Sequence, residues 1–170
     1  MTRTLIIGLG NPILGDDGVG WKVAELVRYL ESGAGNQQPP PSETEAVQGM
    51  PSVEVDCVSL GGLSLMERMV GYQRVILIDS MQTGQIKEGS IRILALEELP
   101  NQFAGHSASA HDTSLITALE TGRRMGLDLP DSVIIVAVEA KNVYEFSEEL
   151  SPLIASAVPD MVKAVLSVLK

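Results

Sequence analysis

Two consecutive carboxylates follow a glycine-rich turn near the start of the chain. Residues 8–20 read GLGNPILGDDGVG and contain Asp16 and Asp17. Aspartate at a helix start commonly caps free backbone N–H groups, which would explain one of the pair. Capping does not explain why glycines flank the pair on both sides. The pair therefore has two open interpretations, a structural cap and a functional site.

The same turn is close to the dinucleotide-binding fingerprint G-x-G-x-x-G. The third glycine is absent, because Ile13 stands at its position. A helix N-terminus attracts phosphate, but the carboxylates of Asp16 and Asp17 would repel it. The sequence therefore disfavours a nicotinamide dinucleotide at this turn.

The elements around the turn are a strand and a helix. Residues 5–7 are an apolar run without alternation, typical of a strand buried on both faces. The following helix is predicted from the spacing of its apolar residues, Val19, Val23, Leu26, Val27 and Leu30. A strand, turn and helix in this order indicate an α/β sheet.

A third carboxylate follows the most apolar strand of the chain. Residues 75–78 are Val-Ile-Leu-Ile and lead directly into Asp79. In open α/β sheets, sites form beyond the carboxyl ends of the strands, so we expect Asp79 at the same edge as Asp17. The alternative is a solvated aspartate at a strand end.

Both histidines lie in one short segment. His106 and His111 are the only histidines in the chain, and an amphipathic helix with Asp112 as its expected N-cap follows them. The segment should return the chain to the edge that carries Asp17 and Asp79. Each histidine also has a plain interpretation as a surface-loop residue, which we favour for His106.

The remaining pattern completes the fold class. Strands are predicted at 53–58, 90–94 and 132–138, and helices near 65–70 and after Ser151-Pro152, where Pro159 should kink or restart the last helix. The link 81–88 is too short for a parallel crossover, so strand 90–94 should run antiparallel to 74–79. We predict an α/β three-layer sandwich: a twisted, mostly parallel sheet of about five strands, one of them antiparallel, with helices on both faces.

Composition limits the domain count and the partners. The 170 residues suit a single domain, 1–170, in which the glycine- and proline-rich stretch 32–52 is expected to be a mobile inserted loop. A net charge of −10 without a basic patch argues against nucleic acid and anionic membranes. No uninterrupted apolar run approaches the roughly 20 residues of a membrane span, and no signal peptide is recognisable. The single cysteine, Cys57, is expected in the core of a cytoplasmic protein.

Together these motifs resemble the hydrogenase maturation endopeptidases over nearly the whole chain. The opening pattern G-x-G-N-x4-D-D-G-x-G is similar to the family signature, and Ile78-Asp79, Ser109-Ala110-His111-Asp112, Val138-Glu139 and Glu149-Leu150-Ser151-Pro152 match later segments. Residues 59–64 depart from it, because they lack the Asp and Thr of the Asp-Gly-Gly-Thr-type loop that many members use in substrate choice. The departure leaves the target hydrogenase open.

The resemblance implies an activity and a site. Such enzymes remove the C-terminal extension of the nickel-iron hydrogenase large-subunit precursor after nickel insertion. Carried over by position, Asp17, Asp79 and His111 would be the metal ligands and act in catalysis through the metal, with Asp16 as possible support. Two carboxylates and an imidazole suit nickel, zinc or manganese.

Two forms of the chemistry, and two other functions, remain open. The metal is either the precursor's own nickel or another divalent ion held by this chain, which would activate a water. The expected partner is the precursor, with no nucleic acid and no membrane insertion. The alternatives are a non-catalytic nickel-binding checkpoint factor in hydrogenase assembly and a small-molecule or nucleotide-binding α/β protein.

Overall fold

The computed structural model describes residues 2–32, 52–98 and 112–170. Nearly all of the predicted inserted loop 32–52, as well as His106 and His111, therefore lies outside the described residues. The elements in chain order are β1 (Thr4–Leu9), η1 (Gly15–Gly18), α1 (Val19–Glu31), β2 (Val53–Val58), α2 (Gly62–Arg68), β3 (Arg74–Met81), β4 (Ile91–Ala95), η2 (Leu96–Glu98), α3 (Asp112–Arg124), β5 (Ser132–Glu139) and α4 (Pro152–Leu169).

The strands form one mixed sheet in the order β2-β1-β3-β5-β4. Strands β2, β1, β3 and β5 pair in parallel, whereas β4 is antiparallel to β5. The predicted direction of β4 is confirmed. Its neighbour is β5 rather than β3, because β5 pairs with β3 along its whole length.

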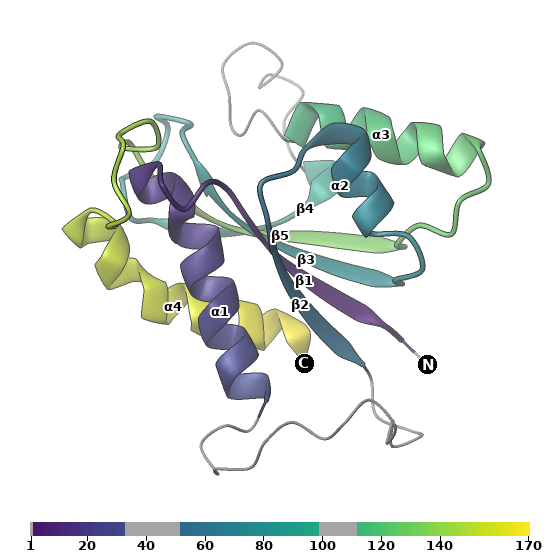
Figure 1. The fold of residues 1–170 in the computed structure, drawn as a ribbon, viewed down its shortest axis with the longest axis horizontal. Helices are drawn as coiled ribbons and strands as arrows, with labels where there is room; N and C mark the ends of the chain where they lie inside the picture. Colours follow the sequence, from purple (N-terminus) through teal and green to yellow (C-terminus); the bar gives the residue numbers. More distant parts are fainter. Residues whose placement is uncertain (1, 33–51, 99–111) are drawn as a thin grey trace.

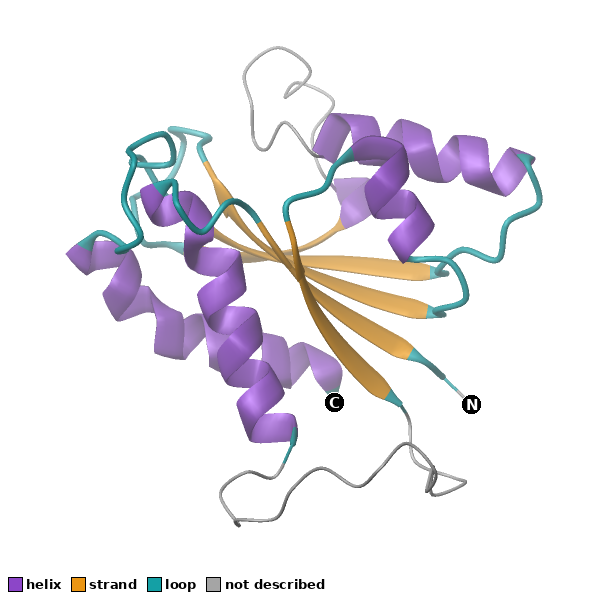
Figure 2. Ribbon diagram, viewed as in Figure 1, coloured by secondary structure: helices purple, strands orange, loops and turns teal. Residues whose placement is uncertain are grey.

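Helices cover both faces of the sheet, as predicted (Figures 1 and 2). Helices α1 and α4 lie on one face, and α2 and α3 lie together on the other. Alternate residues of β1 point to opposite faces of the sheet. Leu5, Ile7 and Leu9 pack with α2 and α3. Ile6 packs with α1 and α4. The strand is apolar throughout because both of its faces are buried.

Glycines let the start of α1 approach the strands closely. A Cβ on Gly20 would lie 2.2 Å from the carbonyl oxygen of Leu9 and 2.4 Å from that of Ile78, and one on Gly8 would lie 2.4 Å from the carbonyl oxygen of Gly20. Gly10 has a φ of 116°, which other residues rarely adopt. These glycines seat the segment before α1 at the carboxyl ends of β1 and β3.

Helix α4 is tied to the rest of the fold at both ends. The carboxylate of Asp16 accepts a hydrogen bond from the backbone N–H of Ser151 at 2.7 Å, at the start of the helix. At its end, the Arg74 guanidinium donates to the carbonyl groups of Val168 and Leu169. An acid near the N-terminus and a base near the C-terminus both complement the helix dipole.

The expected restart at Pro159 does not occur. Helix α4 continues through this residue as one element. The turn around Pro159 is exposed, so water can bond to the Ala155 carbonyl that the missing N–H leaves free.

One described helix, α4, is long and apolar enough to cross a membrane by length and composition. It carries Asp160 and Lys163 on its exposed side, whereas Ile154, Met161 and Val165 are buried against the sheet layer. This pattern is also that of an ordinary core helix.

Candidate functional site

Asp17 lies in η1 at the carboxyl edge of the sheet. Its Oδ2 accepts a hydrogen bond of 2.7 Å from the backbone N–H of Asn11, across the glycine turn. Its Oδ1 lies 3.4 Å from the Oγ of Ser80, near the end of β3. Neither η1 nor α1 has a side-chain cap, so the capping interpretation does not describe Asp17. Its carboxylate instead links the turn to β3.

Asp79 lies inside β3, which extends two residues beyond the predicted end. The side chain is only 4% exposed, so the alternative of a solvated strand-end aspartate is wrong. One carboxylate oxygen accepts a hydrogen bond of 2.8 Å from the backbone N–H of Ser80. Leu77 and Met81 belong to the core cluster shared with α2 and α3, and strand alternation places Asp79 on that same side. Asp17 contacts Ser80, whose side chain alternates to the other face of β3, so both carboxylates lie at the carboxyl end of this strand.

Asp16 has a different environment from its neighbour. It is completely buried, and its Oδ1 accepts the bond from Ser151 at the start of α4. This bond runs to α4, whereas the contacts of Asp17 run to Asn11 and Ser80. The two adjacent carboxylates therefore anchor different elements, and the cap function suggested for the pair applies to α4 rather than to the helix that follows.

The loop after β2 contacts the same turn. The Ser59 hydroxyl donates a hydrogen bond of 2.6 Å to the carbonyl of Gly10. Leu60 and Leu63 are 37% and 58% exposed. The segment that departs from the family pattern in the sequence thus borders the site edge and presents apolar side chains there.

Glu139 is a buried structural residue that the sequence indicated only as the acid ending a strand. Its side chain is 3% exposed and accepts hydrogen bonds from the backbone N–H groups of Thr83 and Gly84 and from the Thr83 hydroxyl, at 2.7–2.8 Å. These bonds fix the loop that follows β3. The loop forms one wall of a cavity of about 640 Å³, which Glu139, Lys87 and Lys141 also line.

The predicted third ligand, His111, lies outside the described residues. Helix α3 begins at the next residue, and its Leu115 and Leu119 pack in the cluster on the side of the sheet that Asp79 shares. Among residues 2–32, 52–98 and 112–170, no group of three histidine, cysteine or acidic side chains could hold a metal ion. Asp17 and Asp79 supply carboxylate oxygens, which fit part of a divalent-cation site.

The thiol of Cys57 is no candidate nucleophile. It is half-buried in β2, and its Sγ lies 4.0 Å from the carbonyl oxygen of Trp21. Burial raises the pKa of the thiol, which keeps it protonated near neutral pH. The expectation that Cys57 is a packing residue agrees with this environment.

Comparison with known proteins identifies a family. Residues 51–168 match the HycI model, described as hydrogenase maturation protease. Over 170 residues the chain is 24% identical to the hydrogenase 2 maturation protease of Escherichia coli K12, covering 99% of this chain and 91% of the relative. It is also 24% identical to a putative hydrogenase maturation protease of Methanocaldococcus jannaschii, over 98% and 96% of the two chains.

Solved structures of the family share the fold. The E. coli hydrogenase maturating endopeptidase HybD has a TM-score of 0.72 at 24% identity, covering 99% of this chain and 92% of that one. The maturation protease HycI of Thermococcus kodakarensis has a TM-score of 0.64 at 20% identity, with 99% and 92% covered. The family model spans well over half of the sequence, and the described strands and helices have the family's architecture. The chain belongs to the hydrogenase maturation protease family.

Proposed function

We propose that this enzyme removes the C-terminal extension of a nickel-iron hydrogenase large-subunit precursor after nickel insertion. In this proposal Asp17, Asp79 and His111 bind the nickel carried by the precursor, which is part of the substrate. The observation that supports it most is the contact between Asp17 and Ser80, because it brings one carboxylate beside the residue that follows the other.

The carboxylate of Asp17 is suited to receive a ligand. Its Oδ2 is fixed by Asn11, whereas its Oδ1 has only a contact of 3.4 Å, longer than an ordinary O–H···O bond of about 2.5–3.0 Å. The residue is also partly accessible at the turn. Asp17 can therefore exchange its contact with Ser80 for a metal bond without breaking the bond that positions it.

Asp79 would present its carboxylate to the metal in one fixed orientation. Its burial and its bond to the Ser80 N–H restrict the carboxylate to one direction. A cation bound to both carboxylates would offset their negative charge. A divalent metal at such a site supplies a Lewis acid for the peptide carbonyl. In this proposal Asp17, Asp79 and His111 place the scissile bond by binding the nickel.

The test uses a purified precursor with and without nickel. The enzyme is incubated with each form, and the loss of the C-terminal peptide is followed by intact mass. We expect cleavage of the nickel-loaded form only. Binding of the nickel-loaded form without cleavage would favour the checkpoint factor instead.

Variants of the proposed ligands locate the reaction. Asp17→Asn, Asp79→Asn and His111→Ala should each abolish cleavage while circular dichroism and thermal unfolding show a folded protein. Glu148→Gln is the matched control, because Glu148 is exposed and outside the proposed site. Normal cleavage by the two aspartate variants would overturn the assignment.

A chelation experiment distinguishes the two sources of the metal. The enzyme is treated with a chelator, which is then removed before the nickel-loaded precursor is added. Unchanged cleavage indicates that the precursor's nickel is sufficient. Cleavage that returns only after a divalent metal is added back to the enzyme indicates a metal held by this chain, and contradicts the form proposed here.

A further inference from the structure

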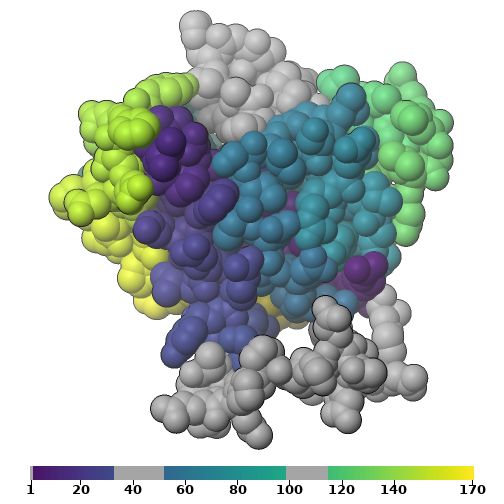
Figure 3. All heavy atoms as spheres, viewed as in Figure 1, coloured from purple at the N-terminus to yellow at the C-terminus, as the bar shows by residue number. Residues whose placement is uncertain are grey.

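A second cavity lies between η1 and the start of α4. Its volume is about 300 Å³, and its lining combines the turn before Asp17 with the loop after β5: Gly15, Asp16, Asn142, Glu145, Ser147, Glu149, Leu150, Ser151 and Pro152. Figure 3 shows the residues of the glycine turn and the loop 140–150 side by side on the surface. Neither the chemistry proposed above nor the family comparison assigns a role to this cavity.

Backbone hydrogen bonds hold the two walls of the cavity together. The Gly15 N–H donates to the carbonyl of Ser147 at 2.7 Å, and the Asp16 N–H donates to that of Asn142 at 3.1 Å. Ser147 in turn donates its N–H to the carbonyl of Ile13 at 3.1 Å. The cavity is therefore preformed, which reduces the entropy lost when a ligand binds.

The cavity is acidic and contains an unused hydrogen-bond acceptor. Asp16, Glu145 and Glu149 line it, and its lining has no lysine or arginine. Asp16 is completely buried, and its Oδ2 has no hydrogen-bond partner among the described residues. The Oγ of Ser151, which also lines the cavity, likewise has no hydrogen-bond partner among the described residues. A buried acceptor without a donor is costly, so this floor favours a ligand that brings hydrogen-bond donors.

The acidic side chains and the size of the cavity favour an organic cation as its ligand. An anion is disfavoured, because the carboxylates repel it and Asp16 already occupies the start of α4. The cavity is also far larger than a single ion, and within the described segments no three of its side chains group around one metal position. A guanidinium carries five donors on a flat charged group and pairs well with carboxylates.

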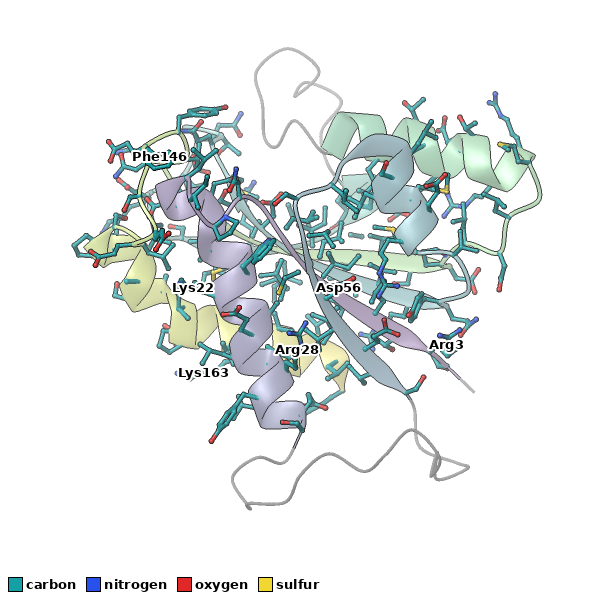
Figure 4. All side chains as sticks on the ribbon, in the orientation of Figure 1. Arg3, Lys22, Arg28, Asp56, Phe146 and Lys163 are labelled. Carbon is teal, nitrogen blue, oxygen red and sulfur yellow. The ribbon has the colours of Figure 1, made fainter. Side chains whose placement is uncertain are left out.

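The loop that carries Glu145 also exposes two aromatic side chains. Phe146 and Tyr144 are 84% and 74% exposed, and both belong to the loop that carries Glu145. Figure 4 shows Phe146 at the outer limit of this loop, directed away from the sheet. Aromatic faces stabilise both the charge and the apolar stem of an arginine side chain.

We infer that this cavity is a docking site for an arginine side chain of the protein substrate. The carboxylates of Glu145 and Glu149 would pair with the guanidinium at the opening, and the Oδ2 of Asp16 would accept a hydrogen bond at the floor. Asp16 and Asp17 are consecutive residues of η1 but anchor α4 and β3 respectively, so η1 joins the docking site to the reaction edge. The identity of the partner rests on the proposed function, whereas the binding chemistry does not.

The direct test measures binding of a small probe without any proteolysis. Nα-acetyl-arginine amide is titrated into the whole enzyme and followed by amide chemical shifts, with Nα-acetyl-citrulline amide as a neutral compound of nearly the same shape. We expect saturable binding of the arginine probe, with a dissociation constant of about 1 mM, and shifts centred on residues 142–151. Absent saturation, or equal binding of the citrulline probe, overturns the inference.

Variants on the same loop test the carboxylates. The double change Glu145→Gln and Glu149→Gln should weaken arginine binding about fivefold, because exposed ion pairs contribute modestly. Glu148→Gln is the matched control, since Glu148 is an exposed acid of the same loop that does not line the cavity. Equal weakening by the control would show a general charge effect and contradict the specific site.

Processing kinetics connect the site to the substrate. If the precursor docks here, the double variant should raise KM about fivefold and leave kcat unchanged, while the control changes neither. A fall in kcat with unchanged KM would contradict docking. This kinetic result rests on the proposed function, whereas arginine binding is measured on the enzyme alone and persists even if no precursor is cleaved.

Discussion

The close approach of α1 to the strands makes Gly20→Ala a stringent test of the structure. The added Cβ would lie 2.2 Å from the carbonyl oxygen of Leu9 and 2.4 Å from that of Ile78, and both are backbone atoms that cannot rotate away. Overpacking of this kind costs about 3 kcal/mol, at the upper end of its usual range. Alanine gains about 1 kcal/mol in helix propensity over glycine. We therefore expect a net loss of about 2 kcal/mol.

Thermal unfolding measures this loss. For a chain of this length, a loss of about 2 kcal/mol corresponds to a fall in Tm of about 4–8 °C. Processing of the precursor should fall as well, because a displaced α1 carries Asp17 away from Ser80. Gly126→Ala is a comparison variant for backbone strain alone, since nothing lies within 4 Å of its added Cβ and any loss of stability comes from its φ of +80°. A Gly20→Ala enzyme as stable as the wild type would refute the close approach.

Two further predictions concern buried or paired acids elsewhere. The pKa of Glu54 lies below its ordinary value of 4.5, because the Tyr72 hydroxyl and the Arg68 guanidinium donate hydrogen bonds to its carboxylate. The ionised Glu54 carboxylate contributes fully to the free energy of unfolding above about pH 4.5, and this contribution is lost as the pH falls below that value. Glu54→Gln should therefore make the stability less dependent on pH in acid, by less than about 1 kcal/mol because the site is partly exposed. Glu139→Gln should lower the stability by about 1–3 kcal/mol, because an amide oxygen and nitrogen cannot together accept the three bonds from residues 83 and 84; a chemical denaturation curve like that of the wild type would contradict this role.

The layers of the fold were predictable because the apolar signal is strong. Strand β1 is buried on both faces and reads as an unbroken apolar run, and the period of α1 begins at Val19, where the helix starts. The end of β3 was missed for the converse reason. The apolar run stops at Ile78, but pairing with β5 continues to Met81, which lies opposite Glu139. The end of β3 is therefore set by its backbone hydrogen bonds to β5 and not by the hydrophobicity of its residues.

The different structural roles of Asp16 and Asp17 were not predictable from the sequence. Asp16 and Asp17 have the same local sequence pattern, and the direction of each side chain depends on its hydrogen-bond partner. Asp16 accepts a hydrogen bond from the N–H of Ser151, which lies 135 residues further along the chain, and Asp17 contacts the hydroxyl of Ser80. Only the tertiary structure brings these partners together. The role of Asp17 and Asp79 in binding a metal stays a prediction, as does that of His111.

The anchoring of α4 by Asp16 has a consequence for engineering the enzyme. Because the residue that fixes the start of this helix is covalently joined to the proposed metal ligand, a shift at the start of α4 should be passed through η1 to the reaction edge. Substitutions selected for heat resistance along α4 should therefore alter turnover even when they lie far from Asp17. Directed evolution for faster processing should, by the same route, accumulate changes on this helix.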